Sequence, residues 1–213
     1  MARDHVIVAG DHVVRLAYTH GHATVDAVWQ HPANAELRAA RPDPGVLAPA
    51  DVVHVPDAPA RVFEGLSTRR EHTLVVELPL PMLRLVLLRP GGIPYAAHPC
   101  TAELDDTHAR VETDAEGALA LELGPLTSTV ALAFDRQALD LAIAHLQPVE
   151  TTPGWHARLE NLGYAPGPLR GDTPVDPYAV RSAIEELQCD HGLVVDGVIG
   201  PETRAALLAA HGA

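Results

Sequence analysis

The sequence predicts a multidomain α+β fold, and three observations support this prediction. The chain has 213 residues, which is enough for two or three small domains. Its apolar fraction of 47% is sufficient for packed cores. Helical periodicity bounded by glycines fills the last third of the chain, whereas short apolar runs between turn residues fill the middle. The expected divisions are residues 1–57, a linker at 58–70, and domains at 71–147 and 148–213.

The first 57 residues are expected to form a small βααβ module. The predicted elements are a strand at 6–9, helical segments at 13–21, 24–29 and 34–39, and a closing strand at 52–55. Gly10 and Asp11 separate the first strand from the first helix. A simple turn followed by a helix cap is one explanation of this pair, and it requires no ligand.

The same module resembles the LysM family. The resemblance is carried by residues 8–13, by Leu16 and Ala17, and by the closing phrase at 46–56. The sugar groove of LysM modules lies between the first turn and the loop before the last strand. The resemblance therefore implies that the glycan contacts include Gly10, Asp11 and His12. Two residues depart from the family pattern, since His12 replaces a threonine and Ala50 replaces a glycine.

Residues 71–147 are expected to form a small antiparallel β-sandwich. Alternating apolar residues and regularly spaced turns predict strands at 73–78, 83–88, 95–104, 108–112, 119–123, 130–134 and 139–143. A Thr-Asp-x-x-Gly sequence at 113–117 predicts a hairpin turn between two of these strands. Together with the Gly-x-Pro turn at 92–94, it resembles the carboxypeptidase-regulatory type of sandwich, which implies a spacer or carrier.

Residues 148–213 are expected to form three short helices joined by glycine turns. The predicted helices lie at 154–163, at 178–191 and from 201 onward. In the second helix, Val180, Ile184 and Leu187 recur at helical spacing and share one face. A glycine closes this helix and a proline opens the next, which is the usual asymmetry of helix ends.

Three motifs in these helices resemble the peptidoglycan-binding domain of bacterial cell-wall enzymes. They are Arg-Leu-x-x-Leu-Gly-Tyr at 158–164, Ala-Val-Arg at 179–181, and an Asp-Gly-x-x-Gly-Pro motif within 192–207. The resemblance implies a ligand-binding turn, with two aromatic stacking surfaces nearby: Asp196, Gly197, Gly200, Thr203, Tyr164 and Trp155. Core packing of the two aromatic rings, and turn formation by Asp196 and Thr203, are the structural alternatives. The first Asp-Gly turn of the family is replaced here by residues 170–174.

The charge of the chain limits its partners. The formal net charge of −13 disfavours nucleic acid and anionic membranes, because both require a basic protein face. A neutral glycan or a peptide stem remains compatible with this charge. We therefore expect no nucleic-acid and no membrane partner.

No recognised catalytic or metal-binding pattern is present in the sequence. All 15 basic residues are arginines, which excludes Schiff-base, Walker-type and Ser-x-x-Lys chemistry. Two cysteines, Cys100 and Cys189, predict no disulfide framework. One combination stays open, a four-ligand metal site that joins them to His98 and His191. We expect a protein that is not an enzyme and holds no cofactor or metal, although acids that meet only in the fold would escape this test.

The apolar run at the N-terminus is too short for a signal peptide, so we expect synthesis in the cytoplasm without an export signal. The order of modules resembles accessory proteins of type VI secretion and phage-tail-like injection systems. This resemblance implies a non-catalytic peptidoglycan-binding protein, delivered by a tail-like particle or released by lysis. Tail-spike, baseplate or effector proteins would be further partners. The alternatives are a structural adaptor of such a particle, and a cell-wall hydrolase with an unrecognised site.

Overall fold

The structure, a computed structural model, describes residues 2–60, 62–75, 80–105 and 107–212. It contains both helices and strands, which confirms a mixed fold. The chain divides into two compact units, one of residues 1–45 with 49–144 and the other of residues 46–48 with 145–213. Within the described ranges, none of the helices combines the length and the apolar character needed to cross a bilayer.

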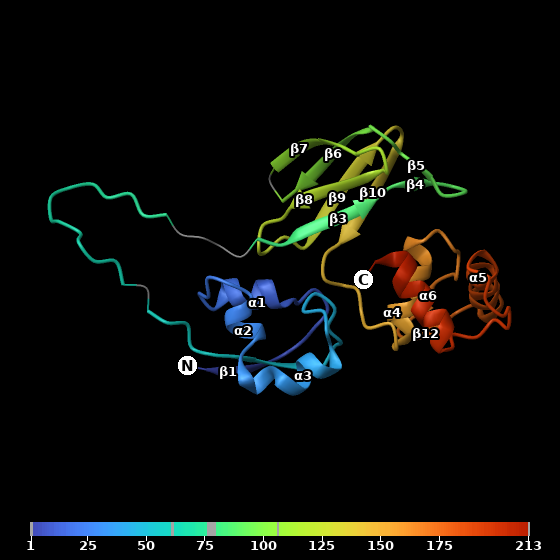
Figure 1. Ribbon diagram of the computed structural model, residues 1–213, viewed down its shortest axis with the longest axis horizontal. Coiled ribbons are helices and arrows are strands. Elements are labelled where there is room, and N and C mark those ends of the chain that lie inside the picture. Colours follow the sequence, from blue (N-terminus) through green and yellow to red (C-terminus); the bar gives the residue numbers. More distant parts are fainter. Residues whose placement is uncertain (1, 61, 76–79, 106, 213) are drawn as a thin grey trace. The chain divides into compact units, whose positions relative to one another are not determined.

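The N-terminal part of the first unit contains a two-stranded antiparallel sheet. In it, β1 (Arg3–Val6) pairs with β2 (Val52–Val55). The helical elements between these strands, drawn in blue in Figure 1, are α1 (Val13–Thr19), α2 (Asp26–Trp29), a 3-10 turn (Pro32–Asn34) and α3 (Ala35–Ala40). The strand predicted at 6–9 is displaced toward the N-terminus. Residues after Val6 bend into a turn that Asp11 closes by accepting the Val8 N–H at 3.2 Å.

A buried amide fastens the helices of this part to β2. Asn34, which is 1% exposed, donates through Nδ2 to the carbonyls of Val28 and His54 at 2.9 and 2.8 Å. Its Oδ1 accepts the His54 N–H at 2.7 Å. Because buried backbone groups need partners, these bonds allow the strand and the helices to pack closely. The apolar side chains buried in this part include Ile7, Val13, Leu16, Val28, Trp29 and Val53.

Residues 56–60 and 62–75 contain no helix and no strand. The predicted linker at 58–70 falls within this stretch. The strand predicted at 73–78 is wrong for residues 73–75, and residues 76–78 lie outside the described residues. Leu74 and Val75 are 47% and 83% exposed. An apolar pattern forms a stable strand only where a neighbouring strand supplies hydrogen bonds, and none in the described ranges pairs with this segment.

The remainder of the first unit consists of antiparallel strands, drawn from green to yellow in Figure 1. A four-stranded sheet has the order β10 (Gln137–Ala142), β9 (Thr129–Phe134), β6 (Pro99–Leu104), β7 (Thr107–Glu112). Two further pairs are β3 (Met82–Val86) with β8 (Ala118–Glu122), and β4 (Leu88–Arg89) with β5 (Ile93–Pro94). Leu119 and Leu121 of β8 share one buried cluster with Ala102, Val130 and Leu132 of the larger sheet, so the two sheets have a common core.

The turn at 113–117 forms, but it is not the hairpin predicted from the sequence. The Asp114 N–H donates to the Ala118 carbonyl at 2.8 Å, and the Gly117 N–H donates to the Asp114 carbonyl at 3.2 Å. However, β7 before the turn pairs with β6, whereas β8 after it pairs with β3. The turn therefore carries the chain from one sheet to another.

Two predicted strands of this region have different bounds in the structure. The segment 83–88 is divided at Leu87, and the segment 95–104 becomes a strand only from Pro99. Both changes have one cause. The Leu87 N–H donates to the Gly117 carbonyl at 2.8 Å, and the Leu87 carbonyl accepts the Tyr95 N–H at 3.0 Å, so these residues bond outside the main ladders.

The second unit contains three helices around one core, drawn from orange to red in Figure 1. They are α4 (Thr152–Asn161), α5 (Pro177–Asp190) and α6 (Pro201–His211), close to the predicted bounds. A short hairpin of β11 (Leu169–Arg170) and β12 (Thr173–Pro174) precedes α5. The buried core of the unit consists of Val149, Leu159, Val180, Ala183, Ile184, Leu187 and Leu207.

The chain before α4 belongs structurally to this helical unit. Thr151 caps α4 by accepting the Gly154 N–H at 3.1 Å. Arg158, which is 1% exposed, donates through Nη1 to the carbonyls of Gln147 and Gly154, each at 2.8 Å. These bonds hold residues 147–148 tightly against the first turn of α4.

Candidate functional site

The chain between α5 and α6 borders a hollow of about 300 Å³, here named the turn pocket. Its lining residues are Gln188, Leu193, Val194, Asp196, Val198, Gly200, Pro201, Glu202 and Thr203. The structure thus brings together at one hollow three of the residues predicted to contact a ligand, namely Asp196, Gly200 and Thr203. Gly197 lies beside them in the turn.

The turn is organised around the side chain of Gln188, which is 1% exposed. Its Nε2 donates to Asp196 Oδ1 at 2.8 Å, and to the Val198 carbonyl and Thr203 Oγ1 at 3.1 Å each. Its Oε1 accepts the N–H groups of Asp196 and Gly197 at 3.0 and 2.9 Å. One buried amide of α5 therefore satisfies the turn and connects it to α6.

Asp196 and Thr203 also bond within the turn. Asp196 Oδ1 accepts the Val198 N–H at 2.8 Å, and Thr203 Oγ1 donates to the Val198 carbonyl at 3.1 Å. The hydrogen bond from Gln188, followed by that from the Val198 N–H, holds the pKa of Asp196 below its ordinary value. Both residues therefore have the structural roles that the sequence leaves open as alternatives, and the Thr203 side chain is buried.

The two glycines of the turn differ in what they permit. Gly197 has φ +70°, and a Cβ there would lie 2.8 Å from Arg181 Cγ and 3.1 Å from Glu185 Oε1. The turn is therefore packed against the side chains of Arg181 and Glu185. Gly200 precedes α6 without a side-chain cap, and a Cβ there would meet open space. The start of α6 is consequently accessible from the turn pocket.

Gln188 is not among the residues that the sequence singles out. It follows Leu187 on the buried side of α5, and it stands eight positions before Asp196. A buried amide in an apolar helix face must find backbone or side-chain partners. That interruption of the apolar face, ahead of an Asp-Gly turn, is the signal that could have identified it.

Trp155 and Tyr164 pack against the core of the second unit, where both are partly buried. The Tyr164 hydroxyl donates to Asp190 Oδ2 at 3.1 Å. Burial, and then this hydrogen bond, raise the pKa of Tyr164 to about 12. Core packing, the structural alternative for these two aromatic residues, describes their placement.

The N-terminal candidates Gly10, Asp11 and His12 immediately precede α1. Gly10 has φ +87°, and a 2.8 Å hydrogen bond joins Asp11 Oδ2 to His5 Nε2. His12 is 6% exposed and caps α1, because its Nδ1 accepts the Arg15 N–H at 3.4 Å. The geometry is therefore a turn followed by a helix cap, in which the cap is His12 and not Asp11.

This cap makes the stability of the N-terminal part dependent on pH. Burial, and then the charge of Arg15, hold the pKa of His12 below its ordinary value of 6.5. The unfolded chain therefore takes up the proton more readily, and the free energy of unfolding falls as the pH drops below about 6.5. We expect His12→Ser, which keeps a cap that cannot titrate, to remove the part of this acid loss that His12 contributes.

Tryptophan fluorescence during urea unfolding measures this effect. A Trp155→Phe background leaves Trp29 as the only tryptophan, and Trp29 is buried in the N-terminal part. The control is the same background without the His12 change. Identical pH slopes of the two proteins between pH 7 and pH 5 would contradict a contribution from His12.

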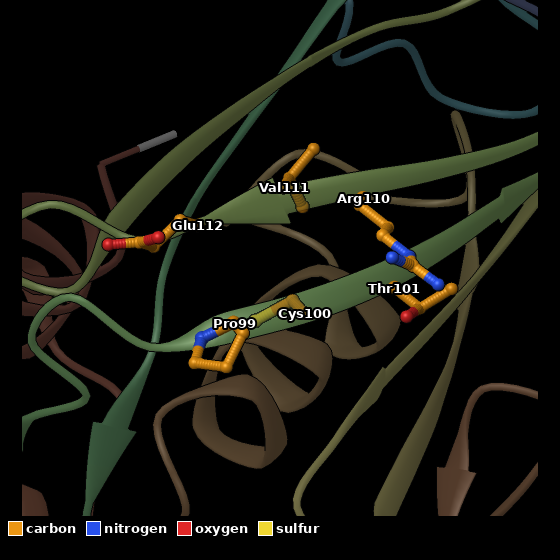
Figure 2. A pocket seen from close by; sticks show the side chains of 6 residues that line it. All are labelled: Pro99, Cys100, Thr101, Arg110, Val111 and Glu112. Atoms are coloured by element: carbon orange, nitrogen blue, oxygen red, sulfur yellow. The ribbon is translucent and has the colours of Figure 1, made fainter.

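A second hollow, of about 440 Å³, lies on β6 and β7 and is lined by Pro99, Cys100, Thr101, Arg110, Val111 and Glu112. Figure 2 shows the Arg110 guanidinium beside Thr101, its partner in the strand register. Cys100 Sγ donates to the His98 carbonyl at 3.6 Å. Burial, and then the charge of Asp135, raise the pKa of the Cys100 thiol. A thiol that stays protonated is a poor nucleophile, so this hollow lacks the features of a cysteine active site.

Among the described residues, no group of three or more His, Cys, Asp or Glu side chains could hold a metal ion. Cys100 is buried in the first unit, whereas Cys189 is exposed in the second. Neither unit therefore contains the four ligands of the metal site that the sequence leaves open.

Part of the second unit is similar to a known protein family. Residues 156–207 match a family described as "Putative peptidoglycan binding domain". The match starts in α4, includes all of α5 and ends in α6, so it contains every residue that lines the turn pocket. No curated protein and no solved structure matches the chain. The C-terminal helices are thus similar to a peptidoglycan-binding domain, and this similarity supports peptidoglycan as the partner.

Proposed function

We propose that this is a non-catalytic peptidoglycan-binding protein whose C-terminal helices make the main contact. The observation that carries the proposal is the family match over residues 156–207, because the turn pocket lies entirely within it.

The chemistry of the turn pocket suits a neutral ligand that is partly apolar. Leu193, Val194 and Val198 supply aliphatic surface. The start of α6 supplies backbone N–H donors that no side chain caps. Acetamide and amide groups of peptidoglycan carry both a methyl or methylene group and a carbonyl acceptor, so they match this combination.

We further propose that residues 1–57 act as a LysM-like second contact, with Gly10, Asp11 and His12 at its turn. The antiparallel strands would then be a spacer of the carboxypeptidase-regulatory sandwich type. The order of the three parts supports an accessory or cargo protein of a contractile injection system. Such a particle, or lysis of the producing cell, would bring the protein from the cytoplasm to a cell wall.

Co-sedimentation with purified sacculi tests the main proposal. The full-length protein and a fragment of residues 145–213 are both expected to pellet. The fragment begins at His145, where the longer segment of the second unit starts, so it keeps the Gln147 carbonyl that Arg158 binds and the Pro148 backbone that packs against Gly154. Gly200→Leu places a bulky side chain at the open start of α6, where it would block the turn pocket. We expect this variant to bind sacculi about tenfold more weakly.

The matched control is Glu186→Gln, an exposed change on α5 that should pellet like the wild type. Circular dichroism must show that the Gly200 variant is folded. If neither the full-length protein nor the fragment pellets, peptidoglycan binding is refuted. Clearing of a cell-wall zymogram by the wild type would instead contradict the non-catalytic assignment and favour the hydrolase alternative.

One observation favours the structural-adaptor alternative. Large apolar side chains are exposed in the segment without regular structure, namely Val62, Phe63, Leu66, Leu74 and Val75. Concentrated apolar exposure often marks a protein-binding segment. Capture of a purified tail-spike or baseplate protein, without retention by sacculi, would support an adaptor over a wall binder.

A further inference from the structure

The most exposed aromatic ring of the second unit belongs to Tyr178, near the start of α5. This side chain is 85% exposed, more than any other large apolar side chain in the described residues. Its backbone is nevertheless fixed, because Asp176 caps α5 and accepts the Tyr178 N–H at 2.9 Å. The ring contributes nothing to the buried cluster, which uses the opposite face of the helix. An exposed aromatic ring on a fixed helix backbone is suited to be a binding anchor.

Exposed apolar side chains of this unit gather at two places, the start of α5 and the turn before α6. They are Val175 and Tyr178 at the first place, and Val194, Val195 and Val198 at the second, with exposures of 53% to 85%. Outside these places, Leu208 is the other such side chain in the described part of the unit, at 39%.

Arg181 connects the two places. It follows Tyr178 by three positions, so the two side chains are neighbours on one face of α5. Its stem lies against the turn, since a Cβ on Gly197 would lie 2.8 Å from Arg181 Cγ. Tyr178, Arg181, Glu185 and Gly197 therefore form one continuous surface, here named the α5 ridge.

The charges of the α5 ridge cancel. Arg181 Nε donates to Glu185 Oε1 at 2.7 Å, so the pair presents hydrogen-bonding groups without net charge. Beside Tyr178, Asp176 is acidic and exposed. Peptide stems of cell walls carry carboxylates, which this acid would repel. The N-acetylated sugars of the glycan strand are amphipathic, with an apolar C–H face and polar hydroxyl and acetamide groups.

We propose that Tyr178 is a sugar-stacking contact, and that the α5 ridge takes N-acetylhexosamine units of the glycan strand. The proposal rests on the proposed peptidoglycan binding, and it names the part of the wall polymer that the C-terminal unit recognises. The ring would cover the C–H face of one sugar, while Arg181 and Glu185 would bond the hydroxyl and acetamide groups of the same or the next sugar.

Variants of Tyr178 in the full-length protein test this proposal by sedimentation with sacculi at increasing wall concentration. Tyr178→Ala is expected to raise the apparent Kd about tenfold, the loss typical of a truncated aromatic anchor. Tyr178→Phe and Tyr178→Trp keep a stacking face and should bind nearly as well as the wild type. Thermal unfolding should be the same for all of them, because the side chain makes no core contact.

Glu186→Gln is the matched control. It lies on the same helix, five positions after Arg181 and about 140° around the axis from it, and it should bind like the wild type. A competition arm identifies the ligand. A soluble tetramer of N-acetylglucosamine should displace the wild type from sacculi, and should displace the Tyr178→Ala protein less readily than it displaces Tyr178→Phe.

The outcomes separate the two proposals. A wild-type protein that does not pellet refutes peptidoglycan binding and the α5 ridge together. A wild-type protein that pellets, with Tyr178→Ala pelleting equally well, overturns the sugar-stacking proposal alone. The same holds if Tyr178→Phe loses as much binding as Tyr178→Ala, or if a soluble stem peptide displaces the protein and the sugar tetramer does not.

Discussion

Replacing Gly154 with alanine is expected to lower the free energy of unfolding of the C-terminal unit by about 3 kcal/mol or more. A Cβ on Gly154 would overlap the Pro148 carbonyl oxygen and would lie 2.7 Å from the Gln147 carbonyl oxygen. These are backbone atoms, and bonds from Arg158 and Thr151 hold them in place. The segment at residues 147–148, which leads into α4, must therefore move, and its hydrogen bonds to Arg158 and Thr151 must break.

Urea unfolding of the 145–213 fragment measures this loss, because Trp155 is its only tryptophan and reports through fluorescence. Gly200→Ala is the matched control. A Cβ at Gly200 meets open space, so alanine there brings only the cost of a poorer helix cap, about 1 kcal/mol or less, which is well below the loss expected at Gly154. Equal unfolding midpoints for the Gly154 and Gly200 variants would show that residues 147–148 do not pack on α4 as described.

Gln188→Ala is expected to destabilise the same unit by about 3 kcal/mol. The change removes the acceptor of two partly buried N–H groups, those of Asp196 and Gly197, and the donor to Thr203 Oγ1. Unsatisfied groups and a small cavity then add their costs. The turn should loosen, so retention by sacculi should fall together with stability in the sedimentation assay.

Gln188→Glu separates the hydrogen bonds that the Gln188 side chain accepts from those that it donates. It keeps an oxygen for the N–H groups of Asp196 and Gly197, but at neutral pH it places a carboxylate beside Asp196 Oδ1. The pKa of the introduced acid should rise in the folded state, so its stability should improve as the pH is lowered. A variant as stable as the wild type at pH 7 would mean that the Nε2 bonds contribute little.

The helices of the second unit follow from the sequence because their end signals are local. Asp176 caps α5 from the adjacent position, and Pro201 opens α6 without requiring a distant partner. The strands follow less well, because pairing is decided by distant residues. The turn at 113–117 is recognisable from its residues, yet β8 takes its partner from a strand more than thirty positions earlier. The apolar pattern of residues 73–75 predicts a strand, but no strand in the described residues pairs with this segment.

The candidate site was predictable in part for the same reason. The motif predicts that Asp196, Gly197, Gly200 and Thr203 lie close together, and the structure places them in the turn before α6 and in the first turn of α6. Their hydrogen-bond acceptor and donor, Gln188, lies in α5 and outside the motif, so the motif alone does not identify it. The aromatic residues were chosen by motif membership, whereas exposure depends on how helices pack. Helix packing partly buries Trp155 and Tyr164, whereas it leaves the ring of Tyr178 exposed to solvent.

The hydrogen bond between Gly197 and Gln188 also affects isoaspartate formation at the Asp196–Gly197 sequence. Asp-Gly sequences convert to isoaspartate when the glycine nitrogen attacks the aspartate side-chain carbonyl and closes a succinimide ring. Here the Gly197 N–H is held by Gln188 Oε1 at 2.9 Å, and Asp196 Oδ1 accepts hydrogen bonds from two donors, the Val198 N–H and the Gln188 amide. The folded turn is therefore protected from a reaction that would lengthen its backbone, and the damage should accumulate only in unfolded chains.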